Sequence, residues 1–143
     1  MLQWRRPKLF YLYAGLIVFS ACGIVVSTYL RVDPGPVAPV ASALVVLLGA
    51  YCIGLELGSI RSAATFLLIG ALAEICGLYT GIPFGNYSYT QNWWPTLLLP
   101  GAMHFPVLLP FAWLMVAGGS FAIASQFTSR LGAAVLAGAI SAV

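Results

Sequence analysis

Charged side chains are scarce in this sequence. Its 143 residues include six Lys or Arg and three Asp or Glu, so that 6% are charged, whereas about a quarter of the residues of an ordinary soluble domain are charged. No charged residue occurs at positions 9–30, 34–55 or 75–129. These numbers exclude a soluble globular domain, because its water-facing surface would need many more charges. We therefore expect most of the exterior to face hydrocarbon.

Motifs for metals, nucleotides and nucleic acids are also missing. The three cysteines, Cys22, Cys52 and Cys76, lie in apolar segments without Cys-x-x-Cys spacing, so neither a disulfide framework nor a zinc site is indicated. The sequence has no phosphate-binding glycine loop, dinucleotide fingerprint or nucleophile elbow. The net charge of +3 comes from basic residues at the ends of apolar segments, which indicates membrane topology rather than nucleic-acid binding. We expect no cofactor, no metal and no nucleic-acid partner.

The apolar segments predict an all-α fold, a polytopic transmembrane helix bundle in one domain. We expect helices at about 9–30, 37–57, 62–79 and 106–127, a partial fifth helix at 131–143 and an outer aromatic loop at 80–105. The last run is too short to cross about 30 Å at 1.5 Å per residue. We therefore expect four full spans and a chain that is a fragment of a longer protein. Gly54 and Gly58, four residues apart, are typical of close helix packing in lipid.

The basic residues predict how the helices are oriented. With the N-terminus inside, five of the six basic residues lie in inner segments and only Arg31 lies outside. This bias predicts a multi-pass protein of the cell membrane with a cytoplasmic N-terminus. The aromatic loop then lies on the outer side of the bilayer.

Two carboxylates fall within the predicted helices, where a charged group costs about 2.5–3.5 kcal/mol. Glu56 lies five residues before Arg61, and an interfacial ion pair between the two is the simpler explanation of it. Glu74 has no basic residue near it in the sequence and is expected about 7–8 Å below the outer interface. A carboxyl group in hydrocarbon without a cationic partner is expected to stay protonated, either as a proton donor or as a hydrogen-bonded link to another helix.

Aromatic residues crowd the segment that follows Glu74. Rings of Tyr and Phe attract positive charge, so an acid beside them suits a reaction that protonates an alkene and passes through a carbocation. An aromatic belt at the membrane interface explains Trp93 and Trp94 equally well, and composition does not separate these two interpretations. His104, the only histidine, either orients or deprotonates a water molecule or is simply solvated.

Two motifs resemble a known family. Residues 74–90 follow the pattern Glu-x-x-Gly-x-x-Thr-Gly-x-Pro-Phe-Gly-x-Tyr-x-Tyr-Thr, and residues 106–115 read PVLLPFAWLM. Together they resemble the integral-membrane carotenoid biosynthesis family, which includes the CruF-type carotenoid 1,2-hydratases and the bisanhydrobacterioruberin hydratases. The resemblance covers about residues 70–117. It implies cofactor-independent addition of water to the terminal double bond of an acyclic carotenoid end group, which gives a tertiary alcohol.

The resemblance also implies site residues. It makes Glu74 the acid and places Tyr87 and Tyr89, the further catalytic residues, in the pocket with Phe84. His104 is added as a catalytic residue from its position near the outer interface rather than from the resemblance. The expected substrate-binding residues are Thr80, Phe84, Asn86, Trp93, Trp94 and Trp113, of which Trp93 and Trp94 come from the aromatic loop rather than from the family motifs. Of these, Thr80 or Asn86 is expected to hold the water.

The expected partners are an acyclic carotenoid substrate and the lipid bilayer. A homo-oligomer and complexes with other carotenoid enzymes stay open. Two other functions also stay open. One is a non-catalytic membrane scaffold or lipid-binding subunit, and the other is a carotenoid-modifying enzyme such as a cyclase or an isomerase.

Overall fold

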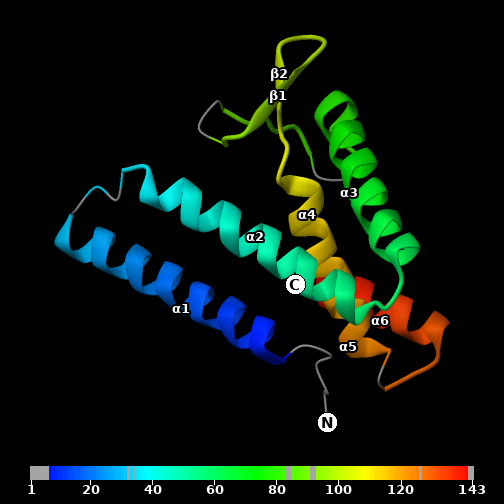
Figure 1. The fold of residues 1–143 in the computed structure, drawn as a ribbon. Coiled ribbons are helices and arrows are strands. Elements are labelled where there is room, and N and C mark those ends of the chain that lie inside the picture. The colour runs from blue at the N-terminus through cyan, green and yellow to red at the C-terminus, as the bar shows by residue number, and fades with distance from the viewer. Residues whose placement is uncertain are drawn as a thin grey trace.

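The computed structural model describes residues 7–31, 33, 35–82, 85–90, 93–125 and 127–141 of the chain. Most of these residues are helical, and one short β-hairpin projects at one end (Figure 1). The elements in chain order are α1 Pro7–Leu30, α2 Val37–Glu56, α3 Ile60–Thr80, β1 Thr96–Leu99, β2 Met103–Pro106, α4 Leu109–Trp113, η1 Leu114–Gly118, α5 Gly119–Ala124 and α6 Arg130–Ser141.

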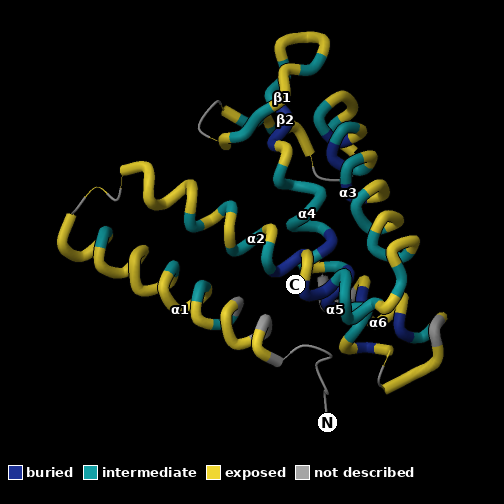
Figure 2. The backbone as a smooth tube through the Cα atoms, viewed as in Figure 1, coloured by how far each residue is buried: buried dark blue, intermediate teal, exposed yellow. Residues whose placement is uncertain are grey.

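Helices α1 and α2 form an antiparallel pair (Figure 1). The turn between them begins at Arg31, whose backbone is left-handed with a φ of 53°. The Asp33 carboxylate then accepts a hydrogen bond from the Gly35 backbone N–H at 2.9 Å, which is how aspartate commonly closes a turn. Most described residues of α1 are exposed (Figure 2), and α1 packs mainly on α2.

The core lies where α2, α3, α4 and η1 meet. Ala50 and Ile53 of α2 pack against Leu114 of η1, and larger side chains of α3 and α4 surround these three residues. Figure 2 shows the buried residues concentrated at this crossing. A second, smaller cluster of three alanines joins α5 to α6.

The fourth helical run differs from the helix expected at 106–127. It spans Leu109–Ala124 as α4, η1 and α5, and η1 is a π-helical turn. Pro106 lies outside it, because this proline is the last residue of β2. At 1.5 Å per residue the run is about 24 Å long, which is shorter than a hydrocarbon core of about 30 Å.

The segment at 80–105, expected to be a loop, contains a β-hairpin, so the all-α prediction is wrong here. Strands β1 and β2 pair antiparallel, starting with Thr96 opposite Pro106. The turn at 100–102 contains a Pro-Gly pair, which favours chain reversal. The Tyr79 hydroxyl near the C-terminal end of α3 donates to the Pro100 carbonyl oxygen at 2.9 Å and so links the hairpin to α3.

Two helices in the described part of the chain, α2 and α3, are long and apolar enough to cross a membrane. Only 22% and 17% of their most apolar windows are buried inside the protein, so most of this apolar surface faces outward. The stretches Ala14–Leu30 and Leu109–Ala124 are apolar but shorter. Length and composition therefore support two membrane-crossing helices among the described residues, rather than the four full spans expected, and indicate association with a membrane.

Candidate active site

Glu74 is a buried acid on α3. Glu74 is 6% exposed. Among the described residues, Ser120 is the only other polar residue that is buried. The buried residues of α3 are Gly70, Glu74 and Gly77, which are four and three residues apart and therefore lie on one face of the helix. Glycine on both sides leaves room for side chains from other elements to reach the carboxyl group.

Three side chains donate hydrogen bonds to the Glu74 carboxyl group. The Tyr87 hydroxyl lies 2.7 Å from Oε2, and the Tyr89 hydroxyl lies 3.2 Å from the same oxygen. The indole Nε1 of Trp113 lies 3.0 Å from Oε1. The Tyr87 hydroxyl is also 3.4 Å from the backbone carbonyl oxygen of Glu74. We call Glu74, Tyr87, Tyr89 and Trp113 the acid cluster.

The chain returns to Glu74 through two glycines in the left-handed conformation. Gly81 ends α3 with a φ of 73°, and its N–H donates to the Gly77 carbonyl oxygen at 2.8 Å. Gly85 has a φ of 84°, a conformation that costs residues with a Cβ about 1–2 kcal/mol. Beyond these turns, Tyr87 and Tyr89 stand two apart in non-helical chain, where such residues point to the same side.

Aromatic rings form a continuous wall beside the carboxyl group. The ring centroids of Tyr87 and Tyr89 are 5.5 Å apart with an interplanar angle of 80°. The centroids of Tyr89 and Trp93 are 5.3 Å apart with an angle of 68°. Both pairs have the edge-to-face geometry that aromatic rings prefer. The wall therefore continues from the acid cluster to Trp93.

Trp113 reaches Glu74 because α3 and α4 approach closely at Gly70. A Cβ atom at position 70 would lie 2.6 Å from Cβ of Trp113, which is closer than real Cβ atoms come. Only glycine fits there without displacing a helix. Neither the approach nor the role of Gly70 was foreseen from the sequence, in which Gly70 carries no signal beyond its small size.

Burial raises the pKa of both tyrosines of the acid cluster. It raises the pKa of Tyr87 well above the usual value of 10.0, and the hydrogen bond to Glu74 adds to this effect. Burial, followed by the charge of Glu74 and the hydrogen bond to it, raises the pKa of Tyr89 to about 12. Both side chains are therefore neutral hydrogen-bond donors at physiological pH.

Thr80 and Asn86, the residues expected to hold water, lie at and just after the end of α3, and that role stays a prediction. The Thr80 hydroxyl donates to the Cys76 carbonyl oxygen at 2.7 Å and accepts from the Ile82 N–H at 3.1 Å, which stabilises the end of α3. Asn86 is exposed, and its Oδ1 lies close to Gly81. A Cβ atom added at Gly81 would be 2.5 Å from this oxygen.

Of the remaining expected residues, Trp93 and His104 have described contacts with Tyr89 of the acid cluster. Trp93 and Trp94 are 55% and 64% exposed, and only Trp93 has a described ring contact with the wall. His104 of β2 is half-buried and forms an isolated antiparallel bridge with Tyr89. Phe84, also expected to bind substrate, lies outside the described residues.

Metal-binding groups do not gather anywhere in the described ranges: no three His, Cys, Asp or Glu side chains lie close enough to share an ion. The predicted pairing of Glu56 with Arg61 stays a prediction. Glu56 is the last residue of α2 and is half-buried, whereas Arg61 is exposed in the first turn of α3.

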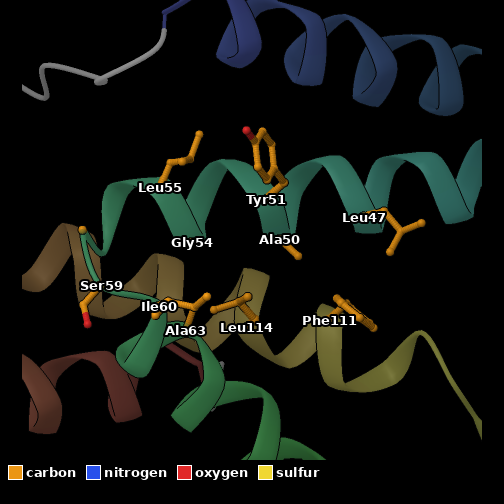
Figure 3. Close-up of a pocket in the computed structure, with 11 residues that line it drawn as sticks. Leu47, Ala50, Tyr51, Gly54, Leu55, Ser59, Ile60, Ala63, Phe111 and Leu114 are labelled. Atoms are coloured by element: carbon orange, nitrogen blue, oxygen red, sulfur yellow. The ribbon is translucent and has the colours of Figure 1, made fainter.

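Glu74 lines none of the three described cavities. The largest, of about 520 Å³, lies between α2, the start of α3 and the fourth helical run (Figure 3). A second cavity, of about 280 Å³, lies between α2, α4 and the two tryptophans Trp93 and Trp94. The third, of about 120 Å³, lies between α1 and α2. Of these three, the second is closest to the acid cluster along the aromatic wall.

Comparison with known proteins identifies the family. A family model described as carotenoid biosynthesis protein matches residues 34–143, a segment that contains every residue of the acid cluster. No curated protein and no solved structure matches the chain. The matched segment is longer than the stretch at 70–117 on which the sequence resemblance was based, and the resemblance is confirmed. The chain belongs to the carotenoid biosynthesis protein family.

Proposed function

We propose that this protein hydrates the terminal double bond of an acyclic carotenoid end group, the reaction of the CruF-type carotenoid 1,2-hydratases, with Glu74 as the acid. The observation that carries the proposal is the buried Glu74 carboxyl group, held by two phenols and an indole. An acid kept from water beside ring faces suits the protonation of an alkene, because water would otherwise compete for the proton. The proposal includes a multi-pass protein with a cytoplasmic N-terminus, whose substrate reaches the site from the bilayer.

In the proposed mechanism the acidic proton is carried by Oε2 of Glu74. The indole N–H of Trp113 can only donate, so Oε1 is an acceptor in either protonation state. A phenol both donates and accepts, so that Tyr87 or Tyr89 can rotate its hydroxyl to accept the proton on Oε2. The Tyr89 bond is the longer of the two, at 3.2 Å against 2.7 Å, and we assign Tyr89 as the hydroxyl that gives way to the alkene.

Proton transfer from Oε2 to the less substituted alkene carbon uses the π electrons of the double bond and leaves a tertiary cation. Glu74 becomes a carboxylate, and the faces of Tyr87, Tyr89 and Trp93 stabilise the cation. Water donates a lone pair to the cation, and its surplus proton returns to Glu74 directly or through Tyr89. The net change is the addition of one water. His104, which pairs with Tyr89 through the backbone, is the residue assigned to orient this water.

Replacing Glu74 by Gln tests the proposal. The amide oxygen still accepts from Trp113 and the amide N–H₂ can donate to a tyrosine, so the cluster keeps its shape but loses its acidic proton. In a carotenoid-producing host we expect the protein to accumulate and the hydrated pigment to disappear, as measured by mass spectrometry. Glu56→Gln is the matched control. Glu56 lies at the end of α2, next to the start of α3, whereas Glu74 lies near the other end of α3. Removing the Glu56 carboxyl group should therefore leave the pigment unchanged.

The same measurement separates the other functions. A hydrated product that persists in Glu74→Gln contradicts the assigned acid. A modified pigment without the mass of an added water indicates a cyclase or an isomerase. Pigments that are identical with and without the gene indicate a scaffold or a lipid-binding subunit.

A further inference from the structure

Two described cavities follow one another along α2. The smaller, of about 280 Å³, which we call the outer cavity, lies between the first half of α2, the start of α4 and Trp93 and Trp94. The larger, of about 520 Å³, which we call the inner cavity, lies between the second half of α2, the start of α3, and Phe111 and Leu114 (Figure 3). The two cavities therefore share α2 as a wall but meet different parts of the protein.

The α2 residues that line these cavities form two adjacent surface rows. Side chains four residues apart make a continuous ridge along a helix. One ridge consists of Pro39, Ala43, Leu47, Tyr51 and Leu55. The neighbouring ridge consists of Ser42, Val46, Ala50, Gly54 and Gly58, the last in the turn after the helix. No position of either ridge is skipped, so the two cavities lie one after the other along the same face of α2. We call this face, with its two cavities, the α2 groove.

Resting on the function proposed above, we propose that the α2 groove binds the polyene chain of the substrate lengthwise, with the reacting end group beside Trp93 and Trp94. The lining side chains carry no charge, and their only hydroxyl groups are those of Ser42, Tyr51 and Ser59. Such a surface favours a hydrocarbon over a polar ligand.

The length of the groove favours a rod over a compact ligand. From Pro39 to Gly58 the polypeptide extends about 28 Å along the axis of α2. This length is close to the hydrocarbon thickness of a bilayer, about 30 Å. A long conjugated polyene is a stiff rod, because its double bonds do not rotate. The outer cavity alone, at about 280 Å³, is slightly below the range of about 300–1,000 Å³ for ligand pockets. The outer cavity therefore has room for an end group, whereas the rest of the polyene needs the inner cavity.

The outer end of the α2 groove borders the acid cluster at two points. Trp93 lines the outer cavity, and its ring centroid lies 5.3 Å from that of Tyr89. Ala112, another lining residue, directly precedes Trp113, which donates to Glu74. A polyene in the groove would therefore have its terminal double bond next to Tyr89.

The leucines Leu47 and Leu44 offer a matched test of the groove. Leu47 lines the inner cavity one helical turn from Ala43 of the outer cavity and is 43% exposed, whereas Leu44 is 50% exposed and lines none of the described cavities. Both can take a larger side chain without disturbing the core. We expect Leu47→Trp to lower the affinity of the purified protein for lycopene, an acyclic polyene, by about tenfold or more, because the indole fills the groove. Leu44→Trp should bind lycopene as the unaltered protein does. The shift of the lycopene absorption spectrum measures both.

A short ligand tests whether the groove is used along its length. Myrcene, a short acyclic terpene, needs only the outer cavity, so its effect on tryptophan fluorescence should be the same in Leu47→Trp and Leu44→Trp. Equal lycopene affinity of the two variants would overturn the proposal, as would an equal loss in both. Loss of myrcene binding in Leu47→Trp alone would also overturn it, because the substitution would then act beyond the groove.

The binding assay does not depend on turnover. If lycopene binds in the groove as expected but no alcohol forms, the proposed hydration fails and the groove stands. If Glu74→Gln abolishes hydration while Leu47→Trp binds lycopene normally, the hydration stands and the groove fails.

Discussion

Tyr87 and Tyr89 donate to one oxygen of Glu74, and this arrangement ties the ionisation of the phenols to the fold. The folded pKa of Tyr89 is raised to about 12 from 10.0, so folding favours the neutral phenol. The resulting stabilisation is complete below pH 10 and is lost as the pH rises through about 12. The acid cluster should therefore keep its hydrogen bonds across the whole physiological range.

We expect Tyr89→Phe to remove the ionisation step near pH 12 from the tyrosinate absorbance curve of the folded protein. The substitution should also lower stability at neutral pH by about 1–3 kcal/mol, because a hydrogen bond to the Glu74 carboxyl group is lost. Ultraviolet titration and chemical unfolding measure the two effects. Loss of a step near pH 10 instead would contradict the burial of this phenol.

At the same scale, the sequence singled out all four residues of the acid cluster but not the contact that joins Trp113 to Glu74. Glu74, Tyr87 and Tyr89 stand within 15 residues of one another, and the glycines between them indicate the chain reversal that brings them together. Trp113 lies 39 residues from Glu74. Its contact depends on the rotation of α4 and on the close approach at Gly70, which are set by tertiary packing and leave no local pattern.

Among the elements, the contact of α3 with α4 is the one that positions the indole. We expect Gly70→Ala to destabilise the protein by about 1–3 kcal/mol, because the added methyl group would overlap Cβ of Trp113, which cannot move without α4. The proposed hydration should fall as well, because the substitution would strain the hydrogen bond from Nε1 of Trp113 to Oε1 of Glu74.

Gly15→Ala is the control for this substitution. A Cβ at Gly15 of α1 would have nothing within 4 Å, and alanine favours a helix over glycine by up to about 1 kcal/mol. We expect unchanged or slightly higher stability, as measured by thermal unfolding in detergent. Similar losses in the two variants would show that the effect does not come from the contact with Trp113.

Helix positions followed from hydropathy more closely than the hairpin did. Proline, glycine and charged residues bound the first three helices, and the structure begins and ends them within two residues of the expected positions. The short apolar run before Pro100 does not alternate with polar residues, so it has no strand periodicity. The Pro-Gly pair between two short apolar runs was the available signal for β1 and β2.

For the whole molecule, the distribution of basic residues predicts which end lies outside the cell. We expect a cysteine at Ser88, in the exposed segment before the hairpin, to react with a membrane-impermeant thiol reagent in intact cells. A cysteine at Ser129, exposed before α6, should react only after the membrane is opened. Both variants need Cys22, Cys52 and Cys76 replaced by Ala. The opposite labelling pattern would contradict the cytoplasmic N-terminus.

Helix α1 stands apart from this chemistry. It precedes the matched family segment, packs mainly on α2, and among the described residues contributes no side chain to the acid cluster or to the two cavities of the α2 groove. Substitutions on its outward surface that stay apolar and keep its contact with α2 should therefore leave the geometry around Glu74 unchanged. This helix is thus the place to attach a label or to change the length of an apolar surface without touching the reacting groups.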